Sequence, residues 1–114
     1  MSADCLFCKI VAGEIPADVV HETETTLAFR DIDPKAPVHV LVVPRAHHPN
    51  VAALAAGAPG LAAEVLATAA AVAEAEGLTG SGYRTLFNTG PDAGQTVFHV
   101  HAHVLGGHPL GGMA

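Results

Sequence analysis

The sequence predicts an α+β fold in which one long helix lies across a five-stranded antiparallel sheet. Five short segments are rich in β-branched or alternating apolar residues, and short connections typical of hairpins join the outer ones. A single alanine-rich stretch is long enough for a major helix. Half of the 114 residues are apolar and only 14% are charged, which supplies one hydrophobic core. We expect one domain over residues 1–114, with a core at about 5–107 and a tail at 108–114.

A short helix is predicted at the N-terminal end, from Cys5 to about Ala12. Asp4 precedes it and has a side chain suited to an N-cap. Gly13 follows it and favours a stop.

Three strands are expected next. They lie at residues 18–22, 25–31 and 38–43. A tight turn at Thr23 and Glu24 joins the first two. Pro34 and Pro37 bracket the loop before the third strand, which is nearly all apolar and which Pro44 should end.

The long helix is predicted at residues 59–76, with Gly77 as its stop. Its apolar residues form one stripe that could lie across a sheet. The stripe consists of Leu61, Val65, Leu66, Ala69, Val72 and Ala73. Glu64, Thr68 and Glu74 should lie largely outside it.

The last two strands are expected at residues 83–88 and 96–105, joined by a loop at 89–95. The remaining tail, GGHPLGGMA, has no regular pattern.

The charge balance excludes several classes of partner. Five basic residues against eleven acidic ones give a net charge of −6, which argues against DNA, RNA and polybasic membrane contacts. The N-terminus lacks the basic start and long apolar run of a signal peptide, and the apolar region 51–75 is interrupted. We therefore expect a cytoplasmic protein without a membrane span.

Histidine is unusually abundant, with eight residues against five Lys and Arg. Three of them alternate with apolar residues over Phe98–Val104. In a strand His99, His101 and His103 would share one face. The other face, under the helix, would carry Phe98, Val100, Ala102 and Val104. His39, in a neighbouring strand, could join the row.

Such a row favours one of two chemistries over a plain polar sheet surface. Two or three imidazoles could hold a metal ion. Alternatively, neutral imidazoles could act as nucleophile and acid or base, because their ordinary pKa lies near 6.5. The preceding segment 88–96 carries two glycines, an amide at Asn88 and at Gln95, and a hydroxyl. These residues suit a loop that turns backbone N–H groups toward an oxyanion, which favours phosphate chemistry.

The chain resembles the histidine triad family. The family signature His-φ-His-φ-His-φ-φ, with φ apolar, is met by residues 99–105. The flanking segment 94–98, the N-terminal CLFCKIVAGEIP, LAFRDI with Pro34, and APVH also match, so the similarity runs from about Cys5 to Gly107. The Leu-Gly-Gly ending resembles the Hint branch, the nucleoside phosphoramidases, more than the dinucleoside polyphosphate hydrolases.

The resemblance implies a HIT-like fold and a homodimer whose sheets join, each protomer binding a purine nucleotide. It implies two-step hydrolysis of the phosphorus–nitrogen bond of AMP or GMP amidates, with no cofactor needed for the chemistry. His101 matches the nucleophile, His103 the phosphate contact, His99 and His39 supporting histidines, and Asp31 the ribose ligand. The phosphate loop would comprise Asn88, Gly94, Gln95 and Thr96. The base pocket would comprise Leu6, Phe7, Ile10, Phe29, Ile32 and Leu41.

The cysteine pair Cys5-x-x-Cys8 allows two interpretations. A redox role would need a thioredoxin-like βαβ context, which is absent. Resemblance to bacterial family members implies a structural zinc held by Cys5, Cys8, His47 and His99, with His48 as the alternate ligand. Two buried thiols without a metal are the other possibility.

Two features depart from the resemblance. Thr96 stands where the Hint branch usually has Ser, and the tail after Gly107 lacks the Trp-containing ending of animal members. His108 is expected at the surface. Alternative functions are a dinucleoside polyphosphate hydrolase, a zinc metallohydrolase using the triad, and a non-enzymatic nucleotide-binding protein.

Overall fold

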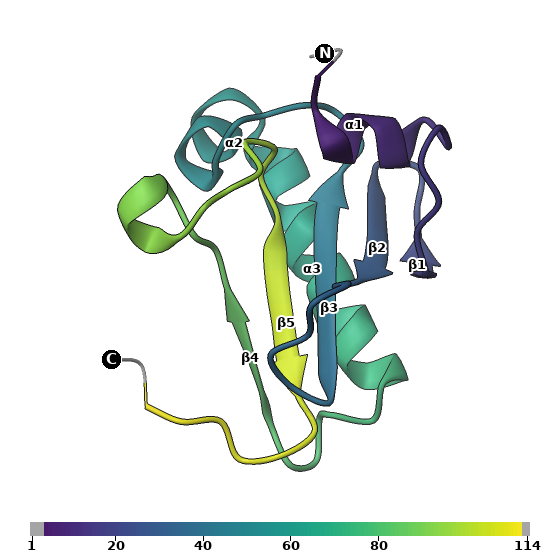
Figure 1. Ribbon diagram of the computed structural model, residues 1–114, viewed down its shortest axis with the longest axis vertical. Helices are drawn as coiled ribbons and strands as arrows, with labels where there is room; N and C mark the ends of the chain where they lie inside the picture. Colours follow the sequence, from purple (N-terminus) through teal and green to yellow (C-terminus); the bar gives the residue numbers. More distant parts are fainter. Residues whose placement is uncertain (1–3, 113–114) are drawn as a thin grey trace.

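The sheet is antiparallel throughout, as predicted, and its strand order is β1-β2-β3-β5-β4 (Figure 1). The computed structural model describes residues 4–112. The strands are β1 Val19–Glu22, β2 Thr26–Arg30, β3 Val38–Pro44, β4 Tyr83–Leu86 and β5 Ala102–Gly106. The helices are α1 Leu6–Val11, α2 Val51–Gly57 and α3 Pro59–Ala75, with a 3₁₀ turn η1 at Pro91–Ala93.

Strand β3 lies at the centre of the sheet and is buried from His39 to Pro44. Its register with β5 places Leu41 opposite His103 and His39 opposite Leu105. His39 is two residues from Leu41, so it shares a face with His103 and lies diagonally from it. The register alone therefore brings these two histidines together.

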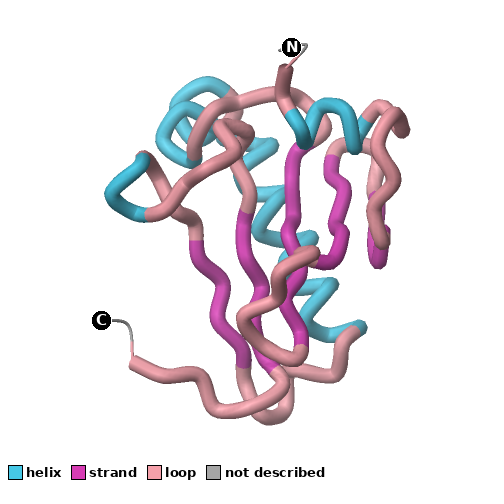
Figure 2. The backbone as a smooth tube through the Cα atoms, in the orientation of Figure 1, coloured by secondary structure: helices cyan, strands magenta, loops and turns pink. Residues whose placement is uncertain are grey.

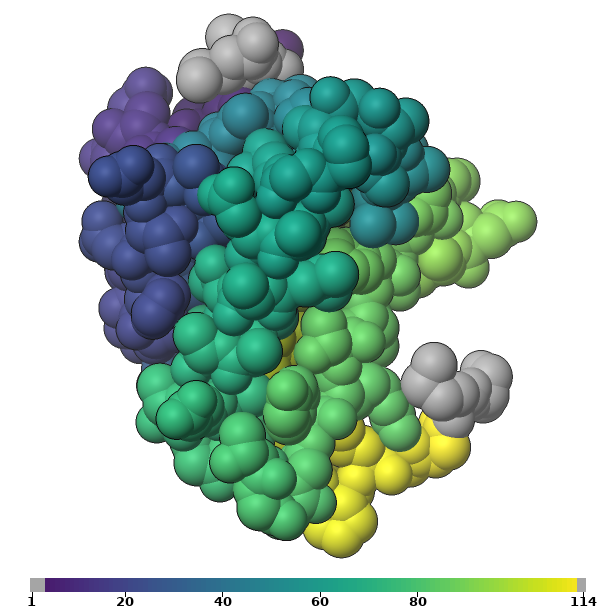
Figure 3. Space-filling model, turned by 180° about the vertical axis from the view of Figure 1, so that it is seen from behind, coloured from purple at the N-terminus to yellow at the C-terminus, as the bar shows by residue number. Residues whose placement is uncertain are grey.

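Helix α3 covers one face of the sheet, and α2 packs beside it (Figures 1 and 2). Figure 3, which views the molecule from behind Figure 1, shows this helical side, with the teal atoms of α2 and α3 spread over it. The core between helices and sheet is made of small apolar side chains. Its fully buried members include Ala28, Val40, Val42, Leu54, Val65, Ala73, Ala102 and Val104.

Helix α2 was not among the predicted elements. The Asn50 side chain accepts a hydrogen bond from the Ala53 N–H at 2.8 Å and so caps it. Leu54 is completely buried and anchors the helix in the core. Among residues 4–112, no helix combines the length and hydropathy needed to cross a membrane.

The predicted stripe of α3 is correct at Val65, Ala69, Val72 and Ala73 and wrong at two positions. Leu66 is 53% exposed, whereas Thr68 is buried and its hydroxyl bonds the Thr26 hydroxyl at 2.7 Å. At about 100° per residue, Thr68 lies about 60° from Val65 and Leu66 about 100° from it. Thr68 is therefore inside the buried face, where Thr26 satisfies its hydroxyl.

The N-cap of α1 is Cys5, not Asp4. The Cys5 Sγ accepts a hydrogen bond from the Cys8 N–H at 3.3 Å. The helix consequently starts at Leu6, and a sulfur takes the place of the expected carboxylate.

The final strand starts later than predicted. Residues 96–101 precede β5 as an irregular segment with bends at Val97 and His99, and the Val100 N–H donates to the His48 carbonyl at 2.7 Å instead of to the sheet. The alternation still buries Val100, Ala102 and Val104. Phe98 is 52% exposed, contrary to the prediction, because the chain has not yet reached the core there. The other predicted strands and helices begin and end within two residues of their observed bounds.

Gly107 follows β5 in a left-handed conformation, with φ of 102°. A Cβ at this position would lie 2.8 Å from the Pro37 Cβ. The glycine therefore lets the loop before β3 close against the end of β5.

Candidate active site

The face of the sheet away from α3 carries a cavity of about 380 Å³, within the usual size range of small-molecule sites. Two groups of predicted site residues line it. The apolar group is Leu6, Phe7, Ile10, Phe29, Ile32 and Leu41. The polar group is Asp31, Asn88, Gly94, Thr96, His101 and His103. Sequence reasoning missed Ile15, Pro16, Ala17, Arg30 and Val97, which also line it; the apolar run after Gly13 was the available signal for the first three.

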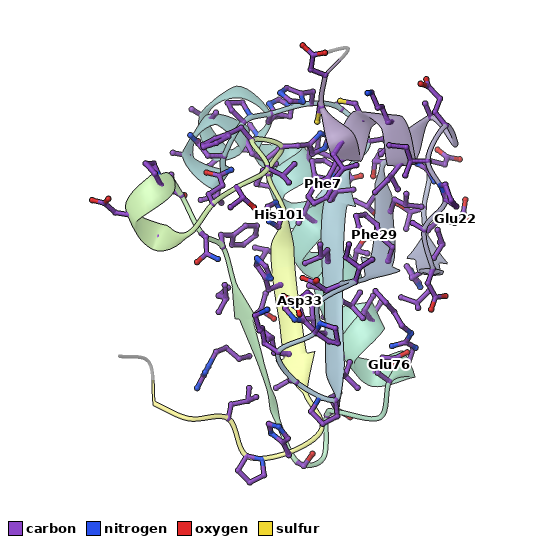
Figure 4. The ribbon with its side chains drawn as sticks, in the orientation of Figure 1. Phe7, Glu22, Phe29, Asp33, Glu76 and His101 are labelled. Atoms are coloured by element: carbon purple, nitrogen blue, oxygen red, sulfur yellow. The ribbon has the colours of Figure 1, made fainter. Side chains whose placement is uncertain are left out.

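Aromatic rings form the apolar end of the cavity. Phe7 meets Phe29 edge-on at 5.4 Å between ring centroids and meets His101 edge-on at 5.0 Å. Phe7, Phe29 and Leu41 are buried, whereas Ile32 is fully exposed at the rim. Figure 4 shows the labelled Phe7, Phe29 and His101 close together below α1.

The backbone fixes the tautomer of His39. The Lys35 N–H donates to the His39 Nδ1 at 3.0 Å, so the ring proton of neutral His39 is on Nε2. That N–H donates to the His103 Nδ1 at 2.8 Å, and an oxygen of Asp31 lies 3.4 Å from the same nitrogen. His39 does not line the cavity, but it orients a histidine that does.

His103 therefore carries its proton on Nε2. Within residues 4–112, this Nε2 is the buried side-chain nitrogen that has no hydrogen-bond partner. An unpaired buried donor costs about 1–3 kcal/mol. An acceptor oxygen brought into the cavity would recover this cost.

His101 has the opposite arrangement. Its Nδ1 bonds the His99 carbonyl at 2.8 Å, which requires the proton on Nδ1 and leaves a lone pair on Nε2. Burial lowers the pKa of His101, and it lowers the pKa of His103 to about 4. Both rings are thus neutral at pH 7, one with a lone pair and one with an N–H donor.

Asp31 stands at the end of β2 with its carboxylate held on both sides. One oxygen accepts the Asp33 N–H at 2.8 Å, and the other faces His39. The neighbouring Arg30 pairs with Glu76 of the α3 C-terminus at 3.0 and 3.1 Å. This end of β2 is therefore tied to the helix behind the sheet.

Gln95 does not line the cavity, although it was predicted in the phosphate loop. Its side chain accepts the Gly90 N–H at 2.9 Å and donates to the carbonyls of Pro49 at 2.8 Å and Val97 at 3.1 Å. The buried Gln95 side chain therefore holds the loop that contains Gly90 and Gly94 in place. Gly90 and Gly94 have φ of 83° and 88°, conformations that glycine adopts without strain.

A second group of residues lies beside the cavity and is called here the thiol–imidazole cluster. Its members are Cys5, Cys8, His47 and His99, with donor atoms within 4.8 Å of one another. The Nδ1 of His99 is 3.4 Å from the Cys5 Sγ and 3.5 Å from the Cys8 Sγ, and the Nδ1 of His47 is 3.4 Å from the Cys8 Sγ. Ligands on one tetrahedral zinc would be about 3.5 Å apart for a sulfur–nitrogen pair.

The position of the ring proton on His99 is the one expected of a metal ligand. Its Nε2 bonds the Pro44 carbonyl at 2.8 Å, so the proton is there and the Nδ1 lone pair faces the thiols. Burial lowers the pKa of His99 to about 4, which keeps the ring neutral. The cluster contains His47 rather than the alternate ligand His48.

Asp31, His39 and His103 also have donor atoms within 4.8 Å. Their protons disfavour a metal, because His39 accepts at Nδ1 and must keep its proton on Nε2. Among the described residues, the three triad histidines do not form a common ligand group, since His99 belongs to the thiol–imidazole cluster. The arrangement does not favour a metallohydrolase centred on the triad.

A family model described as the HIT domain matches residues 12–110. The chain belongs to the HIT family. It is 51% identical over 110 residues to a HIT-like protein of Synechococcus elongatus, covering 96% of both chains. It is 42% identical over 113 residues to the purine nucleoside phosphoramidase of Escherichia coli, covering 99% of this chain and 95% of the relative.

A crystal structure of a HIT family hydrolase from Legionella pneumophila has the same fold. The TM-score is 0.89 at 47% identity, over 93% of this chain and 95% of that one. The expected HIT fold is confirmed, and this HIT protein is an enzyme, a hydrolase of its family.

Proposed function

We propose that this HIT hydrolase cleaves the phosphorus–nitrogen bond of purine nucleoside phosphoramidates through a nucleotidyl intermediate on His101. The observation that carries the proposal is the pair of opposite tautomers in the cavity. His101 presents a lone pair on Nε2, and His103 presents a buried N–H without a partner among the described residues. The 42% identity to the Escherichia coli phosphoramidase supports the reaction type.

The residues along the cavity suit the base, the ribose and the phosphate of a nucleoside monophosphate in turn. The purine would lie between the apolar side chains of Phe7, Phe29 and Leu41, which are buried. The ribose hydroxyls would bond Asp31, whose carboxylate is already oriented. The phosphate would meet Thr96 and His103, together with Asn88 and Gly94. Neutral imidazoles and amides can bind one phosphate in a chain of net charge −6, where a nucleic acid polymer would be repelled.

The reaction has two balanced steps. In the first, the Nε2 of His101 attacks phosphorus, a P–Nε2 bond forms, and the amine leaves with one proton taken from the medium. The His99 carbonyl stabilises the resulting cationic ring at Nδ1, and the His103 N–H bonds a phosphoryl oxygen. In the second step water attacks phosphorus, the P–Nε2 bond breaks, and the proton is returned.

The decisive experiment is turnover of an AMP–amine conjugate by the wild type and by His101→Ala. We expect at least a thousandfold lower rate in the variant, because it lacks the imidazole nitrogen on which the intermediate would form. Equal rates would contradict the assignment. Diadenosine triphosphate, offered in parallel, tests the polyphosphate hydrolase alternative, and AMP binding without turnover of either substrate would indicate a binding protein.

We also propose that the thiol–imidazole cluster holds a structural zinc. The sulfur–nitrogen distances of 3.4 to 3.5 Å and the His99 tautomer support it. Zinc there would supply cross-linking, and no step of the reaction passes through it. The two cysteines of the sequence stand as thiols, which supports a reducing compartment such as the cytoplasm.

A homodimer with a continuous sheet is a further part of the proposal. Both outer strands of the sheet, β1 and β4, have an unpaired edge within residues 4–112. Strand β1 has an irregular register between Val19 and His21, whereas β4 pairs regularly from Tyr83 to Leu86. The regular edge of β4 is the better surface for a second copy.

A further inference from the structure

The thiol–imidazole cluster and the nucleotide cavity share the same short segments of chain. In α1 and its cap, Cys5 and Cys8 belong to the cluster, while Leu6, Phe7 and Ile10 line the cavity. In the segment before β5, His99 belongs to the cluster and His101 to the cavity. Residues of the two sites thus alternate along one backbone.

Phe7 is the side chain that joins the two sites physically. Its ring lies 5.0 Å from the His101 ring and 6.0 Å from the His99 ring, edge-on to both. It belongs to one buried apolar cluster with Cys5, Cys8 and Phe29. Because Phe7 lines the cavity and contacts the His101 ring, a displacement of α1 would change both that contact and the shape of the apolar end of the cavity.

His99 joins them through its backbone. Its Nδ1 faces the thiols, and its carbonyl accepts the Nδ1 proton of His101. On the adjoining loop, His47 belongs to the cluster, and the carbonyl of the next residue, His48, accepts the Val100 N–H at 2.7 Å. A metal ion bound by both His47 and His99 would hold these two chain segments together.

Helix α1 depends on such cross-links because it has six residues. An isolated helix of this length is unstable in water, so tertiary contacts determine its position. Its cap is the Cys5 sulfur itself. The same atom therefore starts the helix and faces the candidate metal.

We propose that zinc in the thiol–imidazole cluster positions the nucleotide cavity, so that metal binding and nucleotide binding strengthen each other. The inference rests on the proposed nucleotide function and concerns how the same cavity is kept in shape. Cys5, Cys8 and His47 are then positioning residues that never touch the nucleotide. Because the coupling is reciprocal, nucleotide must tighten zinc binding by the same factor by which zinc tightens nucleotide binding.

The test measures AMP affinity by calorimetry on zinc-loaded protein, on chelator-treated protein and on His47→Asn. The matched control is His48→Asn, which changes the neighbouring histidine outside the cluster. We expect AMP affinity to fall about tenfold on chelation and in His47→Asn, and to stay at the wild-type value in the zinc-loaded control. Zinc loss with AMP affinity unchanged within about twofold would overturn the proposal.

Amide hydrogen exchange separates positioning from general stability and from failure of the proposed function. Without zinc, exchange should accelerate at residues 8–12 and at Val100 and should stay slow in α3. Acceleration throughout α3 would mean that zinc only stabilises the whole chain, which contradicts the inference. If loaded protein binds no AMP, the proposed function fails, while an unchanged exchange pattern of α1 would separately refute the positioning role.

Discussion

At the scale of single residues, main-chain partners determine which histidine can do what. The Lys35 N–H, the His99 carbonyl and the Pro44 carbonyl set the tautomers of His39, His101 and His99 respectively. Three similar side chains thereby become a hydrogen-bond donor to His103, the proposed nucleophile and a candidate metal ligand. Alternation in the sequence predicts that the histidines gather, but the partner of each second nitrogen comes from distant segments and had to be seen in the structure.

Acid should destabilise the folded chain in part through His103. Burial lowers the folded-state pKa to about 4, against an ordinary value near 6.5. The unfolded chain therefore binds more protons between these values, and the stabilising effect present above pH 6.5 is lost as the pH falls toward 4. For this one group the loss at pH 5 is at most about 2 kcal/mol.

The measurement is urea unfolding at pH 7 and pH 5 on the wild type and His103→Gln. Glutamine retains an acceptor for the His39 N–H and does not titrate. The variant should lose about 1–2 kcal/mol less than the wild type over this interval. An identical loss in both proteins would show that His103 does not contribute to the pH dependence.

At the scale of elements, sequence patterns located the strongly apolar strand β3 and the long helix α3 well, but missed α2 and the start of β5. The central strand β3 and the helix α3 follow directly from apolar runs and alanine content. The short helix α2 was missed because seven residues carry little periodic signal, and its cap and its anchor Leu54 act through tertiary packing. The late start of β5 was missed because Val100 pairs with the loop at His48, a contact without any local signature.

The contribution of α2 can be tested by replacing one leucine with alanine in α2 and, as a control, one leucine with alanine in the neighbouring α3. Leu54→Ala removes a fully buried side chain and should lower the free energy of unfolding by about 2–5 kcal/mol. Leu66→Ala removes a side chain that is 53% exposed and should cost less than about 1 kcal/mol. Urea denaturation measures both, and equal costs would contradict the observed packing of α2.

At the scale of the whole molecule, covering one face of the sheet with α3 leaves the other face for the cavity. The cavity residues come from α1, β2, β3, β5 and the loop between β4 and β5, which are adjacent only after the sheet has formed. Most of this set could be predicted from the resemblance to the HIT family. The bracing role of Gln95 could not, because its contacts with Pro49 and Gly90 follow from the folded loop.

The proposed dimer makes a prediction about mass. Sedimentation equilibrium should give about twice the chain mass of 11.5 kDa. Placing Lys at Tyr83, which is 39% exposed on the edge strand β4, should weaken the association by adding repulsion between two copies. A wild type that sediments as a monomer would refute the shared sheet, and unchanged association in Tyr83→Lys would place the interface elsewhere.

The hydrogen bond from His101 to the carbonyl of His99 has a consequence for how this sequence can vary. A carbonyl belongs to the main chain, so any residue at position 99 can offer it to His101. The imidazole of His99 is needed instead for its contacts with the thiols and with the Pro44 carbonyl. The three histidines therefore differ in how easily they could be replaced. A related sequence without the two cysteines could also lack the imidazole at position 99 and retain the chemistry proposed for His101 and His103.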